Sequence, residues 1–430
     1  MSGRVFIIDG ARTPFLKARD EPGPFSAADL AVMAGRALLA RQPFAAEDLD
    51  EVILGCVIAA PDEANIARIV GLRLGTGFAV PGHTVQRNCA SGLQALASAY
   101  DRISAGRAHL VLAGGTEAMS RAPIQWNMAM SRWLARLYRA KGPGQRLRSL
   151  AGLRPGHLKP VFSLLRGLRD PVVGLSMGQT AEIVAHRFGI GRLAQDSYAL
   201  QSHQRAARAQ ADGLFKDEIE PIYGSQADYY GQDNGVRTDT DLEKLARLRP
   251  VFDRPFGDVT SGNSSQITDG AALVVLASTA AVKRWRLPVL GEIVDHAWAG
   301  VDPAQMGLGP VHATARLLAA NRLAIGDLHH VELNEAFSAQ VLACQAAWAS
   351  PTYARDELGL EAAPGAIDGA RLNPHGGAVA IGHPVGATGA RLILHLAHSL
   401  RDAPGALGLA TLCIGGGQGG AMLIRGGDTS

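Results

Sequence analysis

The 430-residue sequence predicts an α/β protein whose strands and helices alternate in layers. Short apolar runs alternate with stretches of helical periodicity, which favours a layered structure with a largely parallel sheet. A loop, a helix, a buried strand and a glycine cluster occur in the same order in both halves, which indicates an internal duplication. Hydrophobic residues make up 47% of the chain and charged residues 19%, so a disordered or collagen-like protein is excluded.

The first half contains the elements of one layered unit. Apolar runs predict buried strands, and apolar side chains three or four residues apart predict helices. The glycines at Asp9–Gly10 and Gly114–Gly115 are expected to end strands. The expected strands are residues 5–8, 51–57 and 109–113, and the expected helices are residues 27–39 and 89–103.

The second half repeats part of this order. A strand is expected at Val331–Leu333. A glycine-rich loop around His383 leads into a helix over residues 389–400. A buried strand over 407–413 follows, and Gly415–Gly417 ends it.

The segment 121–170 differs from the rest of the chain in charge. It has nine Arg and two Lys but one acidic residue, so it carries 11 − 1 = +10, against +3 for the whole chain. An apolar stripe from Met130 to Tyr138, with Trp133 at helical spacing, predicts a basic amphipathic helix. Three interpretations stay open: a surface helix packed on its own protein, a membrane-surface helix, and a contact for an acidic partner.

Composition and motifs exclude several function classes. A net charge of +3 does not indicate nucleic-acid binding. The four cysteines are scattered, with no CxxC or HExxH pairing, so neither a disulfide framework nor a bound metal is expected. Gly415–Gly420 formally match GxGxxG, but only ten residues follow, too few for a dinucleotide-binding βαβ unit.

The expected location is cytoplasmic. The apolar run near the start, Val5–Ile8, is too short for a secretory signal. No apolar run reaches the ~18 residues that span a bilayer. A reducing compartment would keep the cysteines as free thiols.

Four residues stand where an α/β enzyme places reactive groups. Cys89 opens a predicted helix, where the positive end of the helix dipole favours the thiolate. Cys413 ends a buried strand beside glycines that let a substrate approach the backbone. His383, between Gly and Pro, is a candidate general base for a thiol. Asn334 follows a strand, where its amide could orient a water or an oxyanion.

Taken together, these strings resemble the thiolase family, enzymes that make or cleave 3-ketoacyl-CoA. The resemblance runs nearly from end to end, in family order. Its boxes are Asp9–Phe15, Cys89–Gly92, Ala113–Ser120, Met177–Glu182, Gly262–Ser265, the Asn334 and His383 boxes, and Cys413–Gly417.

The resemblance implies a role for each reactive residue. Cys89 matches the nucleophile that takes the acyl group as a thioester, and His383 the base that activates it. Cys413 matches the second acid/base, which moves the α-proton of acetyl-CoA. Asn334 matches the residue that holds a water, which with His383 forms one oxyanion hole. The backbone N–H groups of Cys89 and Gly415 match the second hole.

The resemblance also implies contacts with the substrate. Ser265 matches the position that meets the pantetheine, and Arg237 one near the nucleotide end of CoA. No permanently bound cofactor is implied, since CoA and acyl-CoA are substrates. The remaining substrate-binding positions, which line the acyl pocket, are Met177, Met306, Ala336 and Phe337.

The implied fold is the five-layered αβαβα thiolase fold, built from two duplicated halves and a loop domain. One half is expected to comprise residues 1–120 with 250–288, and the other residues 289–430. The loop domain, 121–249, includes the basic segment 121–170 and is expected to cover the active site.

Two departures from the family pattern concern the subfamily. The basic segment is longer than in short-chain biosynthetic members and resembles the extension of thiolase subunits in fatty-acid β-oxidation complexes. Those subunits often carry His where this chain has Asn334, whereas short-chain members often have His where this chain has Ser176. The family implies a homodimer or homotetramer. The segment 121–170 suggests contact with a hydratase/dehydrogenase subunit or a peripheral membrane contact, and no nucleic acid is expected.

The leading hypothesis is a thiolase that cleaves 3-ketoacyl-CoA to acetyl-CoA and a shortened acyl-CoA, or runs the reverse Claisen condensation. One alternative is a biosynthetic thiolase specific for acetoacetyl-CoA. A decarboxylating condensing enzyme is disfavoured because that group lacks a second catalytic cysteine, which Cys413 supplies here. A non-catalytic lipid-carrier or scaffold subunit on the same fold is the alternative from another class.

Overall fold

The computed structural model describes residues 3–19, 21–225 and 227–427; the ends of the two predicted halves, residues 1–2 and 428–430, lie outside the described residues. Its large sheet is built from strands of both halves of the chain. These strands are β1 (Val5–Arg12), β2 (Leu16–Lys17), β3 (Glu51–Gly55), β4 (Gly82–Val85), β5 (Leu110–Ala118), β10 (Thr268–Ser278), β11 (Gly291–Gly300), β12 (Leu328–Leu333), β13 (Leu407–Ile414) and β14 (Gln418–Gly426).

The helices of the body surround and separate these strands. They are α1 (Ala27–Ala40), α2 (Ile66–Arg73), α3 (Ser91–Ser104), α7 (Met177–Arg187), α8 (Arg192–Ala211), α9 (Leu242–Ala246), α10 (Thr279–Trp285), α11 (Gly309–Asn321), α12 (Ser338–Ala349), α13 (Pro351–Leu358), α14 (Ala378–Ile381) and α15 (Thr388–Ser399). A small sheet of β8 (Ile222–Tyr223) and β9 (Tyr229–Tyr230) lies apart from the main one.

The two halves have the same strand order, which confirms the predicted duplication. Read toward the centre, the first half runs β4-β3-β5-β10-β1 and the second β12-β13-β14-β11. Leu372 forms a parallel bridge with Val331 of β12. It thereby occupies the position outside β12 that corresponds to β4 in the first half. The halves join where Val5–Ile7 of β1 pairs with β11.

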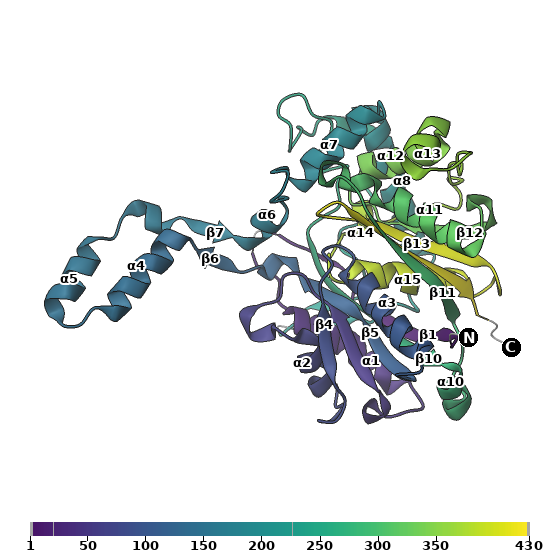
Figure 1. The fold of residues 1–430 in the computed structure, drawn as a ribbon, viewed down its shortest axis with the longest axis horizontal. Helices are drawn as coiled ribbons and strands as arrows, with labels where there is room; N and C mark the ends of the chain where they lie inside the picture. The colour runs from purple at the N-terminus through teal and green to yellow at the C-terminus, as the bar shows by residue number, and fades with distance from the viewer. Residues whose placement is uncertain (1–2, 20, 226, 428–430) are drawn as a thin grey trace.

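Five layers result from this arrangement (Figure 1). Helices α3 and α15 lie in the middle, in one apolar cluster with side chains from the strands of both halves. Helices α1 and α2 cover the outer face of the first half. Helices α11 and α12 cover the outer face of the second half. The predicted αβαβα architecture is therefore confirmed.

The expectation of a largely parallel sheet is wrong. Among the strand pairs of the described residues, only β3–β4, β3–β5 and β12–β13 are parallel. Strand β10 runs antiparallel to β1, β2 and β5, and β14 runs antiparallel to β11 and β13. The glycine cluster after β13 does more than end that strand: Gly416 and Gly417 take positive φ angles of 89° and 76°, which turn the chain back into β14.

Two predicted strand ends and one helix start are also wrong. Strand β1 continues past Asp9–Gly10, with a register shift between Ile7 and Asp9. Strand β5 continues through Gly114–Gly115 to Ala118. These glycines do not form a turn. They let the loop that contains Gly386 approach the strand closely, because a Cβ on Gly115 would overlap the carbonyl of Gly386. Helix α3 begins at Ser91, two residues after Cys89.

Residues 124–162 form an arm that projects from the body (Figure 1). Strands β6 (Ile124–Trp126) and β7 (Pro160–Phe162) pair along it, and α4 (Met128–Arg139) and α5 (Pro143–Ala151) form its outer part. Helix α6 (Ser163–Gly167) follows at its base. The predicted basic helix is confirmed as α4. The expectation that all of 121–249 covers the active site is wrong for the arm.

The central layer depends on glycines, and this generates a prediction. In Gly389→Ala, the added Cβ would overlap the backbone nitrogen of Leu93 and force α15 away from α3. We expect the free energy of unfolding to fall by about 1–3 kcal/mol, the usual cost of overpacking, in denaturant titrations. Gly326→Ala is the matched control, because no described atom lies within 4 Å of its added Cβ. Equal loss of stability in both variants would contradict close packing of α3 on α15.

Candidate active site

A pocket of about 610 Å³ gathers almost all of the predicted site residues. Both halves of the chain contribute to its wall, as do residues from the segment 165–267. Asn334 alone among the predicted residues does not line it; this residue lies buried next to His383. The predicted residues on the wall are Cys89, His383, Cys413, Gly415, Ser265, Arg237, Met177, Met306, Ala336 and Phe337.

Cys89 sits in a tight turn between β4 and α3. The residue before it, Asn88, has a φ of 45°, a left-handed conformation that a non-glycine residue rarely adopts. Hydrogen bonds hold this strained turn: Asn88 Nδ2 donates to the Gly415 carbonyl at 2.7 Å, and Ser91 Oγ donates to the Asn88 carbonyl at 2.7 Å. The turn therefore fixes the direction of the thiol and ties it to the glycine loop after β13.

The expectation that Cys89 is poised as a thiolate is wrong. Burial raises the pKa of the Cys89 thiol, and the backbone N–H of Gly415 offsets only part of that rise. The negative charge of Glu117 raises the pKa further. Desolvation outweighs the helix terminus because α3 starts two residues later. Cys89 is therefore a neutral thiol that needs a base.

His383 has the tautomer that a base for this thiol requires. Its Nδ1 lies 2.7 Å from Thr388 Oγ1, the hydroxyl of which donates to the Pro384 carbonyl at 3.0 Å. Since that hydroxyl has a single proton, it accepts a hydrogen bond from Nδ1–H. The other nitrogen, Nε2, is then an acceptor. Burial lowers the pKa of His383 to about 3, and the charge of Arg391 also lowers it, so the ring is neutral.

Cys413 supplies a second buried thiol at the end of β13. Burial raises its pKa well above the usual value, and the neighbouring Cys89 thiol contributes to the rise. The two cysteines are thus close enough to interact electrostatically. Burial of both cysteines, with the effect of Cys89 on Cys413, therefore leaves the resting pocket with two thiols and a neutral imidazole.

Asn334 connects the end of β12 to the site. Its backbone N–H donates to the Thr411 carbonyl of β13 at 2.9 Å. Its Nδ2 lies 3.4 Å from His383 Nε2. Its Oδ1 is buried and has no hydrogen-bond partner among the described residues. This amide is therefore placed to hold a small polar molecule next to His383.

A cationic part of the pocket wall was not predicted from the sequence. Lys17 and Arg19 line the pocket together with the predicted Arg237. Burial lowers the pKa of Lys17, and Arg237 and Arg19 lower it further, which shows that the three cations are close together. They come from separate segments, so no local charge run identified them.

The roles of Glu117 and Thr388 were not predicted from the sequence either. The buried carboxylate of Glu117 accepts hydrogen bonds from the N–H groups of Val57, Ile58 and Gly386 at 2.9–3.1 Å. It thereby links the chain after β3 to the loop that carries His383. Burial raises the pKa of Glu117 to about 7. A charged residue inside the apolar string Ala113–Ser120 is the signal that could have identified it.

Comparison with known proteins agrees with this geometry. Residues 5–280 match the family model described as "Thiolase, N-terminal domain", and residues 287–426 match "Thiolase, C-terminal domain". The chain therefore belongs to the thiolase family, and the predicted resemblance is confirmed.

Similar proteins place it among acyltransferases of that family. The chain is 38% identical over 424 residues to proteins named 3-ketoacyl-CoA thiolase from Yersinia enterocolitica and Yersinia pestis, covering 98% of this chain and 97% of each relative. Human mitochondrial 3-ketoacyl-CoA thiolase in complex with CoA is 36% identical, with a TM-score of 0.84 over 99% of this chain and 98% of that one. Bacillus anthracis acetyl-CoA acetyltransferase is 35% identical, with a TM-score of 0.83 over 99% of both chains.

The Thr388 hydroxyl generates a prediction about the orientation of His383. Thr388→Val keeps the shape of the side chain but leaves Nδ1–H without its acceptor, so the ring loses its tautomer and direction. We expect kcat to fall about 100-fold, which is the lower end of the rate enhancement that a general base usually provides, with a smaller change in KM. Thr388→Ser, which restores the hydroxyl, is the matched control and should recover most of the activity. If Val and Ser variants are equally active, Thr388 does not position the base.

The raised pKa of Cys89 predicts the pH dependence of its alkylation. A pKa above the usual thiol value moves the titration to higher pH, so only a small fraction is thiolate near neutrality. We expect the rate of inactivation by iodoacetamide to rise about tenfold per pH unit between pH 7 and 9, without a plateau. A plateau below pH 8 would mean that Cys89 is already ionised. Peptide mapping should place the inactivating adduct on Cys89, and a main adduct on Cys56 or Cys344 would contradict its role.

Proposed function

We propose that the protein is a thiolase that cleaves 3-ketoacyl-CoA with CoA into acetyl-CoA and a shortened acyl-CoA, and that also runs the reverse Claisen condensation. The observation that carries the proposal is the meeting of two thiols, Cys89 and Cys413, with the neutral imidazole of His383 on one pocket wall. The names of the relatives support the same reaction.

In the first half-reaction, His383 Nε2 takes the proton of the Cys89 thiol while the sulfur attacks the C3 ketone. The C2–C3 bond then breaks, and its electron pair forms the enolate of acetyl-CoA. Cys413 gives its proton to C2, so acetyl-CoA leaves and the remaining acyl group stays on Cys89 as a thioester. The neutral resting states of all three groups suit this sequence, because both thiols must begin with their protons and His383 must begin with Nε2 free to accept one.

In the second half-reaction, the thiol of free CoA attacks the thioester. The Cys413 thiolate takes the CoA proton, and the imidazolium of His383 returns its proton to the departing Cys89 sulfur. The shortened acyl-CoA leaves, and all groups regain their starting state. Cys413 thus serves first as acid and then as base, and His383 serves first as base and then as acid.

Two oxyanion holes are part of the proposal. The unpartnered Asn334 Oδ1 would hold a water that, with His383, stabilises the thioester enolate. The backbone N–H groups of Cys89 and Gly415 would stabilise the tetrahedral intermediate. The pKa of Cys89 supports this second hole, because the Gly415 N–H already acts on the Cys89 sulfur.

The wall of the pocket divides into parts that suit the two ends of an acyl-CoA. Lys17, Arg19 and Arg237 would attract the phosphates of CoA, and Ser265 would meet the pantetheine. CoA is a substrate in this proposal, not a permanent cofactor. The apolar part would hold the acyl chain and is formed by Met119, Leu165, Leu168, Met177, Phe252, Met306, Ala336 and Phe337.

Cleavage of a series of 3-ketoacyl-CoA substrates tests the proposal. Because α6 and the residues after it extend the apolar wall, we expect kcat/KM to rise from C4 toward longer acyl chains, by about tenfold or more for each fully buried pair of methylenes. Loss of the 3-ketoacyl-CoA absorbance with free CoA present measures the rate. Activity on C4 alone would favour an acetoacetyl-CoA-specific enzyme. Absence of cleavage at every length would favour a non-catalytic scaffold.

The arm suggests that the protein works beside an anionic surface. Among the described residues, no Arg or Lys of 121–170 forms a salt bridge, although the segment carries +10. Lipid headgroups attract such side chains, and aromatic and aliphatic residues anchor in the interface. No helix in the described ranges is long and apolar enough to span a membrane. The exposed apolar side chains of the arm are Ile124, Trp126, Met128, Leu134, Tyr138, Leu147, Leu150, Leu153, Leu158 and Phe162.

We therefore expect peripheral binding through the arm, to anionic lipid or to an acidic hydratase/dehydrogenase subunit. Arg132, Arg136 and Arg139 changed together to Glu should abolish flotation with anionic liposomes at low salt, or the pull-down of that subunit. Changing Arg36, Arg107 and Lys283 to Glu makes the same charge change on the body and should have little effect. If the wild type binds neither partner, or both triple variants bind like it, the arm is a solvated surface.

The proposal also includes an oligomeric state and a cellular compartment. Strand β4 is an edge strand of half-buried residues directly before the Cys89 turn, which suits pairing with a second copy in a homodimer or homotetramer. Catalysis by free thiols, of which the described residues contain four, requires a reducing compartment such as the cytoplasm.

A further inference from the structure

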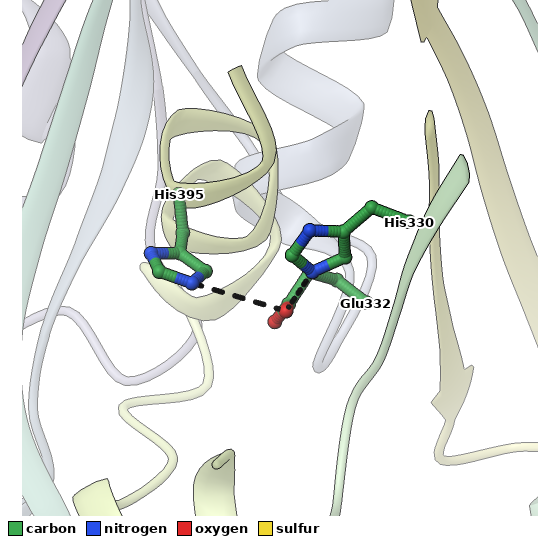
Figure 2. Close-up of side chains that lie close together, drawn as sticks. All are labelled: His330, Glu332 and His395. Atoms are coloured by element: carbon green, nitrogen blue, oxygen red, sulfur yellow. Dashed lines mark hydrogen bonds and ion pairs between the residues drawn. The ribbon is translucent and has the colours of Figure 1, made fainter. Parts of the chain in front are cut away.

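A second cluster of chemistry-bearing side chains lies outside the residues that line the active-site pocket (Figure 2). His330 and Glu332 come from β12, and His395 comes from α15. Residues two apart on a strand face the same side, so both side chains of β12 point toward the helix. All three residues are buried, and one nitrogen or oxygen atom from each lies within 4.8 Å of the others.

Two of these groups, His395 and Glu332, are held in the orientation that a metal ligand needs. His395 Nδ1 lies 3.2 Å from Glu218 Oε2, which leaves Nε2 facing the cluster. Arg391 Nη1 donates to Glu332 Oε2 at 2.9 Å, which leaves Oε1 facing His330 Nε2 at 2.9 Å. Metal-binding histidines and carboxylates have such outer contacts, which fix the tautomer and the direction of the lone pair.

A third imidazole completes the surroundings of the cluster. His375 Nδ1 lies 3.0 Å from His395 Nε2. The centroids of the His330, His375 and His395 rings are 5.1–6.1 Å apart, and their planes cross at 68–87°. Three imidazoles on one tetrahedral zinc ion, with Zn–N of 2.0–2.1 Å, have centroids about 5 Å apart. His375 is only partly buried, so an ion could reach the cluster from solvent at this residue.

We propose that this cluster binds a divalent transition metal, with Zn²⁺ as the best match, through His330 Nε2, Glu332 Oε1 and His395 Nε2. A water molecule would complete the tetrahedral coordination, as it does in zinc sites with three protein ligands. Imidazole and carboxylate donors suit Zn²⁺, and binding replaces the hydrogens on these nitrogens and releases them as protons. The ligands span residues 330–395, so the local Cys and HExxH patterns that led us to expect no metal could not reveal them.

The metal would act on the architecture of the active site. Strand β12 ends immediately before Asn334, and α15 begins at Thr388, the partner of His383. A metal that joins this strand to this helix would hold the two elements together. Because it binds the folded chain, it raises the free energy of unfolding. The role is structural, so the chemistry proposed for Cys89 and Cys413 does not depend on it.

Titration with Co²⁺ and Zn²⁺ tests the proposal on the full chain. The reactive thiols are first alkylated with iodoacetamide so that they cannot bind the ions. We expect one Co²⁺ per chain, with the visible spectrum of a tetrahedral nitrogen–oxygen site, and a rise in Tm with Zn²⁺. His330→Gln and His395→Gln should each weaken binding at least tenfold. His312→Gln, a partly buried histidine bonded to Tyr353 instead, is the matched control and should bind like the wild type.

Three results would overturn the proposal. The first is absence of binding to the wild type, which would mean that the cluster only shares protons; the charge of Arg391 beside Glu332 would favour that state. The second is equal binding by the wild type and His330→Gln. The third is a thiolate-to-Co²⁺ charge-transfer band, which would place the ion on cysteine. If His395→Gln fails to fold, His330→Gln tests the proposal alone. Loss of the rise in Tm with Zn²⁺ in this variant supports the site, and an unchanged rise contradicts it.

Discussion

The close contact between α3 and α15 is the constraint on which the rest of the structure depends. A Cβ on Gly92 would lie 2.8 Å from the Gly386 carbonyl and 2.9 Å from the Ala390 nitrogen, so the two helices meet backbone to backbone at their first turns. Cys89 lies just before the first helix, and His383 lies just before the second. Packing of the helix starts therefore brings the nucleophile and its base together from opposite halves of the chain.

Burial then sets the chemistry of the groups that this packing gathers. It raises the pKa of both thiols and lowers that of His383, so the site rests without charge on any of the three. Charge develops only when a substrate carbonyl can receive the sulfur and the backbone N–H groups can stabilise the oxygen. Such a site avoids an exposed thiolate and keeps its reactivity for bound acyl-CoA.

Sequence alone could predict much of the fold and of the site because chain order and motif chemistry carry that information. The repeated order of loop, helix and strand predicted the duplication, and the Cys89, His383 and Cys413 boxes predicted the residues that meet in the pocket. The parallel or antiparallel direction of each strand could not be predicted from the sequence, since the residues of β10 and β14 are those of any buried strand. The ionisation of Cys89 was predicted wrongly because a sequence shows a helix start but not the depth of burial. Lys17 and the His330–His395 pair were missed because tertiary folding alone brings them to their partners.

The most direct test of covalent thiol catalysis is the mass of the protein after brief incubation with acetyl-CoA. The wild type and Cys413→Ala should both gain one acetyl group, on the peptide that contains Cys89, because in both proteins Cys89 attacks the acetyl carbonyl and His383 takes its proton. In Cys413→Ala the departing CoA takes its proton from water instead of from Cys413. Cys89→Ala should gain none. Acetylation of Cys89→Ala, or equal loss of the acetyl group in both cysteine variants, would contradict the account.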